Sequence, residues 1–201
     1  MSDEVRFEFD EVTDLYDQFI KGWDASLKSV TQQLLDTKKI FWFDKVSGFQ
    51  TRDFDLGHPD LLGSNSVYFF QAQIPKMLLE DKASGLIDLW GQRQGFSDKE
   101  RYPKVSRKNL DIFLKTYNGG DVWVPFYLGK HESALKARLE KHITKASVGT
   151  GALKLGMRAH LFEDWKFKVS WFTFGNLGRR PSFLAIAENL LREQLNPIIG
   201  E

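Results

Sequence analysis

Apolar residues recur along this chain with two different periods, and each change of period marks an expected element. Residues 11–39 have helical spacing, with apolar positions at Val12, Leu15, Tyr16, Phe19, Ile20, Trp23, Leu27, Val30, Leu34 and Leu35. Gly22 and the Asp24-Ala-Ser that follows predict a break into two helices. The polar face is acidic, which argues against DNA contact and favours a packing arm or a dimerisation element.

Three short stretches have the composition and alternation of strands, namely residues 67–74, 122–128 and 167–174. In the first stretch, Tyr68 and Phe70 share one face. The second is followed by Gly129, which lets the backbone turn. Between the first two stretches, helical spacing predicts helices over residues 77–90 and 109–117. A further helix is predicted to start after Ser133, and the last one covers residues 183–195 with Ser182 as its N-cap. Residues 44–64 are rich in Gly, Asp and Pro and predict a loop.

The amino-acid composition restricts the class of protein. The 201 residues are 42% hydrophobic and 27% charged, which is typical of a folded domain with a sizeable core. The chain has no cysteine, so disulfides and thiolate metal sites are excluded. No stretch approaches the roughly 20 apolar residues that span a bilayer, and the acidic start does not resemble a signal peptide, so cytoplasmic residence and no membrane association are expected.

The charge distribution is uneven. Residues 1–24 contain eight acidic and two basic side chains, a net charge of −6. Because the whole chain has a net charge of +1, residues 25–201 have a net charge of +7. Residues 130–158 alone carry seven basic and two acidic side chains, a net charge of +5. A basic body is compatible with nucleic-acid binding, although many solvated surfaces are mildly basic.

The richest chemistry follows the second strand. Tyr127 lies near its end, and Arg138 and His142 lie four residues apart on the following helix, so they share one face. Arginine offers a fixed fork of donors to a phosphate, while histidine and tyrosine can move protons. This pattern indicates an anion-handling site. A solvated helix face beside a core strand is the competing interpretation.

Residues 125–130, which read PFYLGK, together with the Arg138 and His142 that follow, resemble the second half of the GIY-YIG nuclease signature. The resemblance runs from about residue 64 to the C-terminus. Tyr68 in Ser-Val-Tyr stands where the family has Gly-Ile-Tyr, and Glu188 stands where the family has its metal-binding glutamate. An asparagine common after that glutamate would align near Gly200, and Asn196 comes one turn early.

The resemblance implies an α/β (α+β) fold, with a small three-stranded antiparallel sheet flanked by helices. Residues 1–63 would form an N-terminal helical extension and loop, and residues 64–201 the nuclease-like domain. Residues 75–121 would be a helical insertion between the first two core strands. A homodimer is one expectation, because a single active site cuts one strand at a time.

The resemblance also implies the roles of individual residues. Glu188 would hold Mg²⁺ or Mn²⁺, and Arg138 would bind the scissile phosphate. Tyr68 would be the general base, with Tyr127 and His142 positioning water or relaying protons. Lys130 would touch phosphate or lower a tyrosine pKa.

A basic loop in the insertion supplies further candidate DNA contacts, at Arg101, Lys104, Arg107 and Lys108. Its competing interpretation is a solvated loop. The expected function is a divalent-metal-dependent endonuclease acting on DNA, of the restriction type. The alternatives are a nuclease-like fold that binds nucleic acid or protein without cutting, and an unrelated α/β interaction domain.

Overall fold

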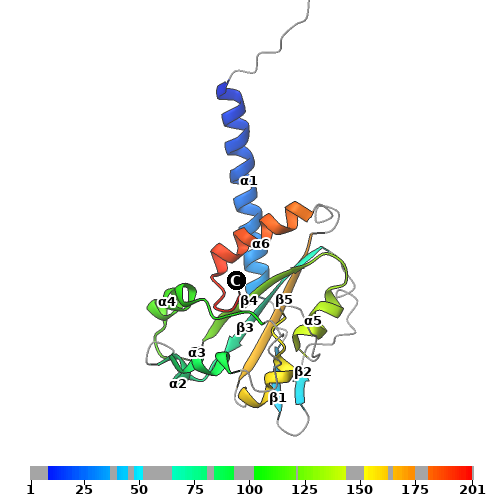
Figure 1. Cartoon of the computed structure of the whole chain (residues 1–201). Coiled ribbons are helices and arrows are strands. Elements are labelled where there is room, and N and C mark those ends of the chain that lie inside the picture. Colours follow the sequence, from blue (N-terminus) through cyan, green and yellow to red (C-terminus); the bar gives the residue numbers. More distant parts are fainter. Residues whose placement is uncertain are drawn as a thin grey trace, which may run out of the picture.

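The computed structural model describes residues 9–36, 40–44, 48–51, 65–80, 84–92, 102–120, 122–143, 152–162, 165–174 and 181–200. Its strands are β1 (Ile40–Asp44), β2 (Gly48–Thr51), β3 (Ser66–Gln73), β4 (Trp123–His131) and β5 (Lys166–Thr173). Its helices are α1 (Phe9–Asp36), α2 (Lys76–Leu79), α3 (Ser84–Gly91), α4 (Arg107–Thr116), α5 (Leu135–Ile143), the 3₁₀ helix η3 (Leu155–Leu161) and α6 (Pro181–Leu195) (Figure 1).

The strands form one sheet in the order β2-β1-β5-β3-β4, and every neighbouring pair is antiparallel. The three strands expected from the sequence are β3, β4 and β5, which lie together, so the mixed α/β fold with an antiparallel three-stranded core is confirmed. The sheet continues beyond this core through β1 and β2. The prediction of a loop over residues 44–64 is therefore wrong at β2, which pairs with the aromatic strand β1.

The helix α1 is continuous over 28 residues, so the predicted break at Gly22 is wrong. A glycine inside a helix costs only about 1 kcal/mol relative to alanine. The burial of Leu27, Val30 and Leu34 against the sheet offsets that cost. Ser26 Oγ donates to Gly22 O at 2.9 Å, as a helical serine can to the preceding turn.

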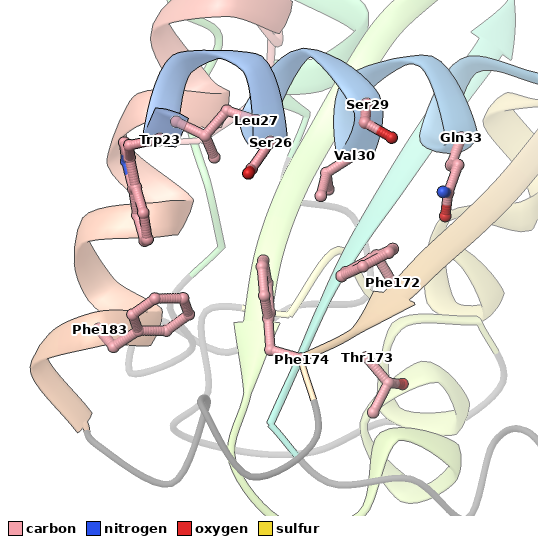
Figure 2. A pocket seen from close by; sticks show the side chains of 10 residues that line it. All are labelled: Trp23, Ser26, Leu27, Ser29, Val30, Gln33, Phe172, Thr173, Phe174 and Phe183. Carbon is pink, nitrogen blue, oxygen red and sulfur yellow. The ribbon is translucent and has the colours of Figure 1, made fainter. Parts of the chain in front are cut away.

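One face of the sheet is covered by α1 and α6. Their buried leucines pack against Val67, Phe69 and Leu128, which project from β3 and β4 to this side. Beside the end of β5, the two helices leave a pocket of about 500 Å³, into which Figure 2 shows the rings of Phe174 and Phe183 facing.

The opposite face is covered by α3, α5 and the segment around η3. Here Tyr68 and Phe70 join a large aromatic cluster that includes Trp90 and Phe126. The connection between β3 and β4 forms α2, α3 and α4, which confirms a helical insertion at this place. Within the described ranges, no helix is long and apolar enough to cross a membrane.

Candidate active site at the β4 edge

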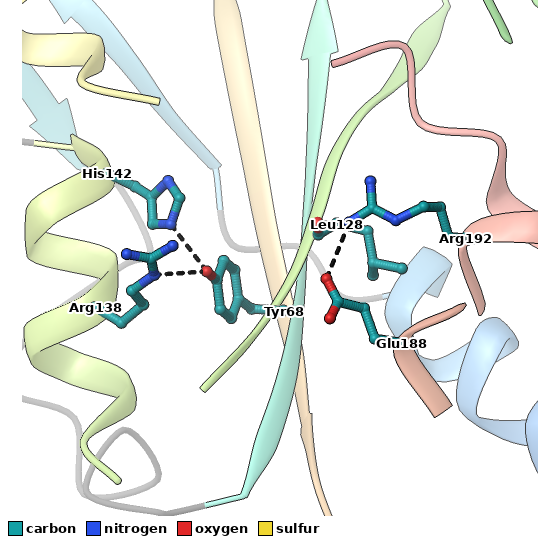
Figure 3. A network of polar contacts seen from close by, with 6 residues as sticks. All are labelled: Tyr68, Leu128, Arg138, His142, Glu188 and Arg192. Atoms are coloured by element: carbon teal, nitrogen blue, oxygen red, sulfur yellow. Dashed lines mark hydrogen bonds and ion pairs between the residues drawn. The ribbon is translucent and has the colours of Figure 1, made fainter. Parts of the chain in front are cut away.

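The hydroxyl of Tyr68 is the centre of a buried polar group on the α5 side of the sheet. Arg138 Nε donates to Tyr68 Oη at 2.9 Å, and His142 Nε2 lies 2.9 Å from the same oxygen (Figure 3). The Tyr68 residue is fully buried on β3, which lies between β5 and β4. Three residues expected to act together, one from a strand and two from α5, are thus in direct contact.

The proton on His142 can be assigned from its second contact. The backbone N–H of Leu153 donates to His142 Nδ1 at 3.0 Å, so this nitrogen is an acceptor. Burial, helped by the charge of Arg138, holds the pKa of His142 well below its ordinary value, so the ring is neutral near pH 7. A neutral ring that accepts at Nδ1 carries its proton on Nε2. His142 therefore donates to Tyr68.

With donors on both sides, the Tyr68 oxygen has its two lone pairs occupied. Its own proton must then point to a third atom. Burial is the largest effect on Tyr68 and raises its pKa; the neighbouring Tyr127 raises it further, and Arg138 opposes both. Tyr68 is therefore protonated near neutral pH, and its oxygen accepts from both partners on α5.

Gly129 makes room for this arrangement. It lies directly opposite Tyr68 in the β3–β4 pair. A Cβ atom at Gly129 would lie 2.5 Å from Tyr68 Oη and 3.0 Å from a carbon of the Tyr127 ring. Any other residue would displace the Tyr68 hydroxyl, so the glycine of the PFYLGK segment is required by packing against Tyr68.

A β-bulge interrupts the alternation of β4 beside Tyr127. Tyr127 pairs with Phe70 in regular register, which places it on the same side as Tyr68, with ring centroids 6.3 Å apart. The register then shifts at Phe70 and Gln71, which leaves Phe126 as an extra residue on β4. Phe126 and Tyr127 are consecutive, yet because of the bulge both join the aromatic cluster on the α5 side.

The environment of Tyr127 connects the two sides of β4. Burial is the largest effect and raises the pKa of Tyr127; the Arg138 charge opposes this, Glu188 reinforces it, and Arg192 opposes it. The Tyr127 residue is 7% exposed, whereas Tyr68 is fully buried. Tyr127 is thus the tyrosine within reach of both Arg138 and Glu188.

Glu188 lies on the α6 side of β4, with the strand between it and Tyr68 in Figure 3. Arg192 Nη2 donates to Glu188 Oε1 at 2.9 Å and to Leu128 O, on β4, at 3.0 Å. The Glu188 side chain is 16% exposed. Arg192 was not singled out from the sequence, although its position four residues after Glu188 was a usable signal.

The C-terminal segment closes the edge of the sheet beside these groups. Ile198 and Ile199 donate their backbone N–H groups to Pro125 O and Phe126 O at 2.9 and 2.8 Å. Gly200 has a positive φ of 115°, and a Cβ there would lie 3.0 Å from Arg192 Nη1 and 3.4 Å from the Tyr127 ring. This segment leaves no free β4 edge along residues 125–127.

Asn196 has a structural role in this place. It adopts a left-handed conformation with φ of 47° directly after the end of α6, and its N–H donates to Arg192 O at 2.9 Å. Such a residue terminates a helix, a role that asparagine fills well.

The candidate DNA-binding cations lie at different places. Lys130 is half-buried and forms an ion pair with Glu132 at 3.2 Å. Lys104, Arg107 and Lys108 are exposed, and Lys104 O accepts from Gly200 N at 2.9 Å, so this loop follows the same sheet edge. Arg101 lies outside the described residues.

Two members of the predicted basic patch over residues 130–158 do not contribute to the surface. Lys154 and Arg158 are fully buried. The Arg158 guanidinium lies 4.4 Å from the ring centroids of both Trp90 and Tyr102 and donates to Trp90 O at 2.6 Å. Arg158 thus packs the β3–β4 connection against the rest of the domain. Because Lys154 and Arg158 are buried, the surface of residues 130–158 carries less positive charge than the sequence implied.

No protein-family model matches this chain, and neither the curated proteins nor the solved structures searched contain a match.

Proposed function

We propose that this chain is a divalent-metal-dependent endonuclease that hydrolyses DNA phosphodiester bonds, as its resemblance to the GIY-YIG nucleases suggests. The observation that carries the proposal is the contact of Tyr68 Oη with both Arg138 and His142. Tyr68 comes from β3 and the other two residues from α5, and the Tyr68 hydroxyl lies against the glycine of the PFYLGK segment. Chance placement on a solvated helix face would not produce this convergence.

Phosphate binding would fall to Arg138. Its Nε–H is committed to Tyr68, which fixes the orientation of the guanidinium plane. The terminal nitrogens are then the ones that would meet a phosphate oxygen, in the two-pronged manner that arginine favours. The exposed Lys104, Arg107 and Lys108 would contact phosphates along the same edge.

Of the two tyrosines, Tyr127 is the better candidate for the general base. Burial raises its pKa, but the charges of Arg138 and Arg192 oppose that rise, and Tyr127 is the more exposed of the two tyrosines. Burial first, and then the charge of Tyr127, raise the pKa of Tyr68, so that residue stays protonated. In this proposal Tyr68 positions Arg138, and Tyr127 accepts a proton from the attacking water.

A metal ion would have to be held mainly by Glu188. Within the described part of the chain, no three His, Cys, Asp or Glu side chains gather as a metal site. One carboxylate completed by water and substrate phosphate is nevertheless a donor set that Mg²⁺ accepts. Bound there, the ion would neutralise charge on the phosphate and the leaving oxygen. Glu188 Oε1 is shared with Arg192, so Oε2 would be the ligand atom.

The Glu188–Arg192 ion pair also favours a second candidate, a nuclease-like fold that binds nucleic acid without cutting it. An arginine that occupies the carboxylate competes with a metal for the same oxygen atoms. If Arg192 excludes the metal from Glu188, the basic surface would still bind phosphates but the metal-dependent step would be absent.

Cleavage of mixed plasmid and phage DNA with Mg²⁺ or Mn²⁺ tests the proposal. We expect discrete fragments from the wild type and none from Glu188→Ala or Arg138→Ala. Glu193→Ala, which removes an exposed carboxylate from the same helix, is the matched control and should cut like the wild type. Salt-sensitive DNA binding without cleavage would favour the binding protein instead, and equal cleavage by Glu188→Ala would refute the site.

A further inference from the structure

Only part of α1 packs on the domain. Its residues from about Trp23 to Asp36 lie along the sheet and α6, while the N-terminal part, residues 9–20, extends well beyond the rest of the molecule (Figure 1). An isolated helix of this length is marginal in water. A projecting helix therefore gains stability if another surface covers it.

The apolar face that packs on the domain continues into the projecting part. Residues seven apart repeat in two columns, Tyr16-Trp23-Val30 and Ile20-Leu27-Leu34, and Val12 and Phe19 extend the face. Leu27, Val30 and Leu34 are buried in the domain. By helical spacing, the same face is apolar where the helix leaves the domain, which marks it as a docking surface.

The charges on this part of the helix restrict its partner. Asp10, Asp14 and Asp17 fall by helical spacing on the far side of the helix, and Glu11 and Asp24 flank the apolar face. An acidic polar face disfavours both an anionic lipid surface and a phosphate backbone. A protein surface that is apolar and close to uncharged is the partner that fits.

Such a surface exists at the base of the same helix. The pocket of about 500 Å³ is walled by Trp23, Phe172, Phe174 and Phe183, with Ser26, Ser29 and Gln33 along its α1 side (Figure 2). Trp23 and Phe183 meet edge to face at 4.9 Å. The α1 residues that line it, from Trp23 to Gln33, span about 16 Å, and residues 9–20 span about 18 Å, at about 1.5 Å per residue.

We propose that α1 pairs with α1 of a second copy of this chain in antiparallel orientation, so that each projecting part covers the pocket of the other copy. The pattern of large and small residues is self-complementary in this orientation. If Phe19 lies opposite Gly22 of the second copy, Leu15 falls opposite Ser26 and Val12 opposite Ser29. Gly22, Ser26 and Ser29 are exposed, and a Cβ at Gly22 would meet nothing within 4 Å.

The antiparallel arrangement explains features that a parallel one would not. A parallel pair would set the two projecting parts against each other and leave both pockets uncovered. The antiparallel pair buries the same patch on each copy, as a two-fold axis requires, and leaves the aspartates in water. This inference does not depend on the proposed nuclease activity, although a two-fold pair would supply two sites for two DNA strands.

The molar mass in solution, measured by light scattering or sedimentation, tests the pairing. We expect a dimer for the full chain, and a monomer for Phe19→Asp at the same concentration. Lys21→Asp places the same carboxylate on the opposite face and should remain dimeric. A monomeric wild type, or a dimer unaffected by Phe19→Asp, would overturn the proposal. The circular dichroism of each variant reports whether the domain is intact.

Engineered cysteines test the orientation, because the natural chain has none. Mild oxidation should cross-link the double variant Leu15→Cys with Ser26→Cys into a covalent dimer, and neither single variant should cross-link efficiently. Strong cross-linking of each single variant would mean a parallel pair, and no cross-linking in all three would mean no pair of this kind. Either outcome would refute the antiparallel model.

Discussion

The two sides of β4 hold candidate site residues in very different ways. On the α5 side, Tyr68 is fully buried and its oxygen is fixed by two hydrogen bonds to Arg138 and His142. On the α6 side, Glu188 makes one ion pair, to Arg192, and both side chains keep some exposure, 16% and 28%. The Tyr68 group is preorganised by packing, whereas the Glu188–Arg192 ion pair can rearrange at a small cost in free energy. A site built in this way would have a rigid phosphate-binding half and an adjustable carboxylate half.

Gly129→Ala should break the rigid side most severely. The new Cβ would meet Tyr68 Oη at 2.5 Å and force the two tyrosines apart. We expect the free energy of unfolding to fall by about 3 kcal/mol, in the range of overpacked cores. Urea denaturation measures this change. Gly91→Ala, where a Cβ meets nothing within 4 Å, is the control and should change stability by less than about 1 kcal/mol.

Tyr68→Phe should come next in effect. It removes the oxygen that accepts from Arg138 and His142 and leaves two donors without their acceptor. A loss of about 2 kcal/mol of stability is expected, since unsatisfied buried donors are costly. Tyr117→Phe, a half-buried tyrosine outside the site, should change stability by less than about 0.5 kcal/mol.

The same variant also tests the role of Tyr127 as base. Without Tyr68 Oη, Arg138 loses the bond that holds its charge beside Tyr127, so the pKa of Tyr127, already raised by burial, should rise further. The base must be deprotonated to act, so the acidic limb of the cleavage-rate profile should move to higher pH while some activity remains. Complete loss of activity in Tyr68→Phe, with activity retained in Tyr127→Phe, would assign the base to Tyr68 instead.

The buried His142 should make stability depend on pH. Burial lowers its pKa in the folded state well below the ordinary 6.5, so the unfolded chain binds a proton that the folded chain does not. Stability should therefore fall as pH drops below about 6.5, by at most about 1.4 kcal/mol per pH unit from this group. Urea denaturation from pH 7 to 5 should show a flatter dependence in His142→Gln.

His131 provides the comparison for this measurement, because its pKa is also lowered by burial but it is only half-buried. His131→Gln should flatten the pH dependence less than His142→Gln. An unchanged slope in His142→Gln would show that this histidine is not the titrating group.

Arg192→Gln should give the smallest change in stability, about 1 kcal/mol, because its ion pair is partly exposed. The same variant also tests whether Glu188 binds a metal ion. If Glu188 holds Mn²⁺, removing the competing arginine should tighten Mn²⁺ binding by up to about tenfold, as isothermal titration calorimetry would measure. Glu188→Gln should abolish the binding. Unchanged affinity in both variants would place the metal elsewhere.

Much of the fold follows from local pattern. The aromatic and β-branched composition of β3 and β4, the alternation in β5 and the helical spacing in α4 and α6 were sufficient to predict these elements. The short β2 was not predictable from its own residues. It pairs with β1, its neighbour in the chain, and β1 in turn joins the sheet by pairing with β5, which lies far along the chain.

Some residues of the candidate site could also be predicted from the sequence, and others could not. Tyr68, Tyr127, Arg138, His142 and Glu188 were selected by their order along the chain. The sequence could not reveal that Arg192 holds Glu188, or that Lys154 and Arg158 are buried, because a charged residue gives no local sign of burial.

The sequence by itself determined which residue types could meet, since strand and helix periods decide which side chains share a face. Only the tertiary structure decided the direction of the proton on His142, because that depends on the backbone N–H of Leu153, eleven residues away. It also decided that the consecutive Phe126 and Tyr127 both face the α5 side, through a bulge that local alternation does not predict. Hydrogen bonds and packing act over a few ångströms, so they become defined only when distant segments are in contact.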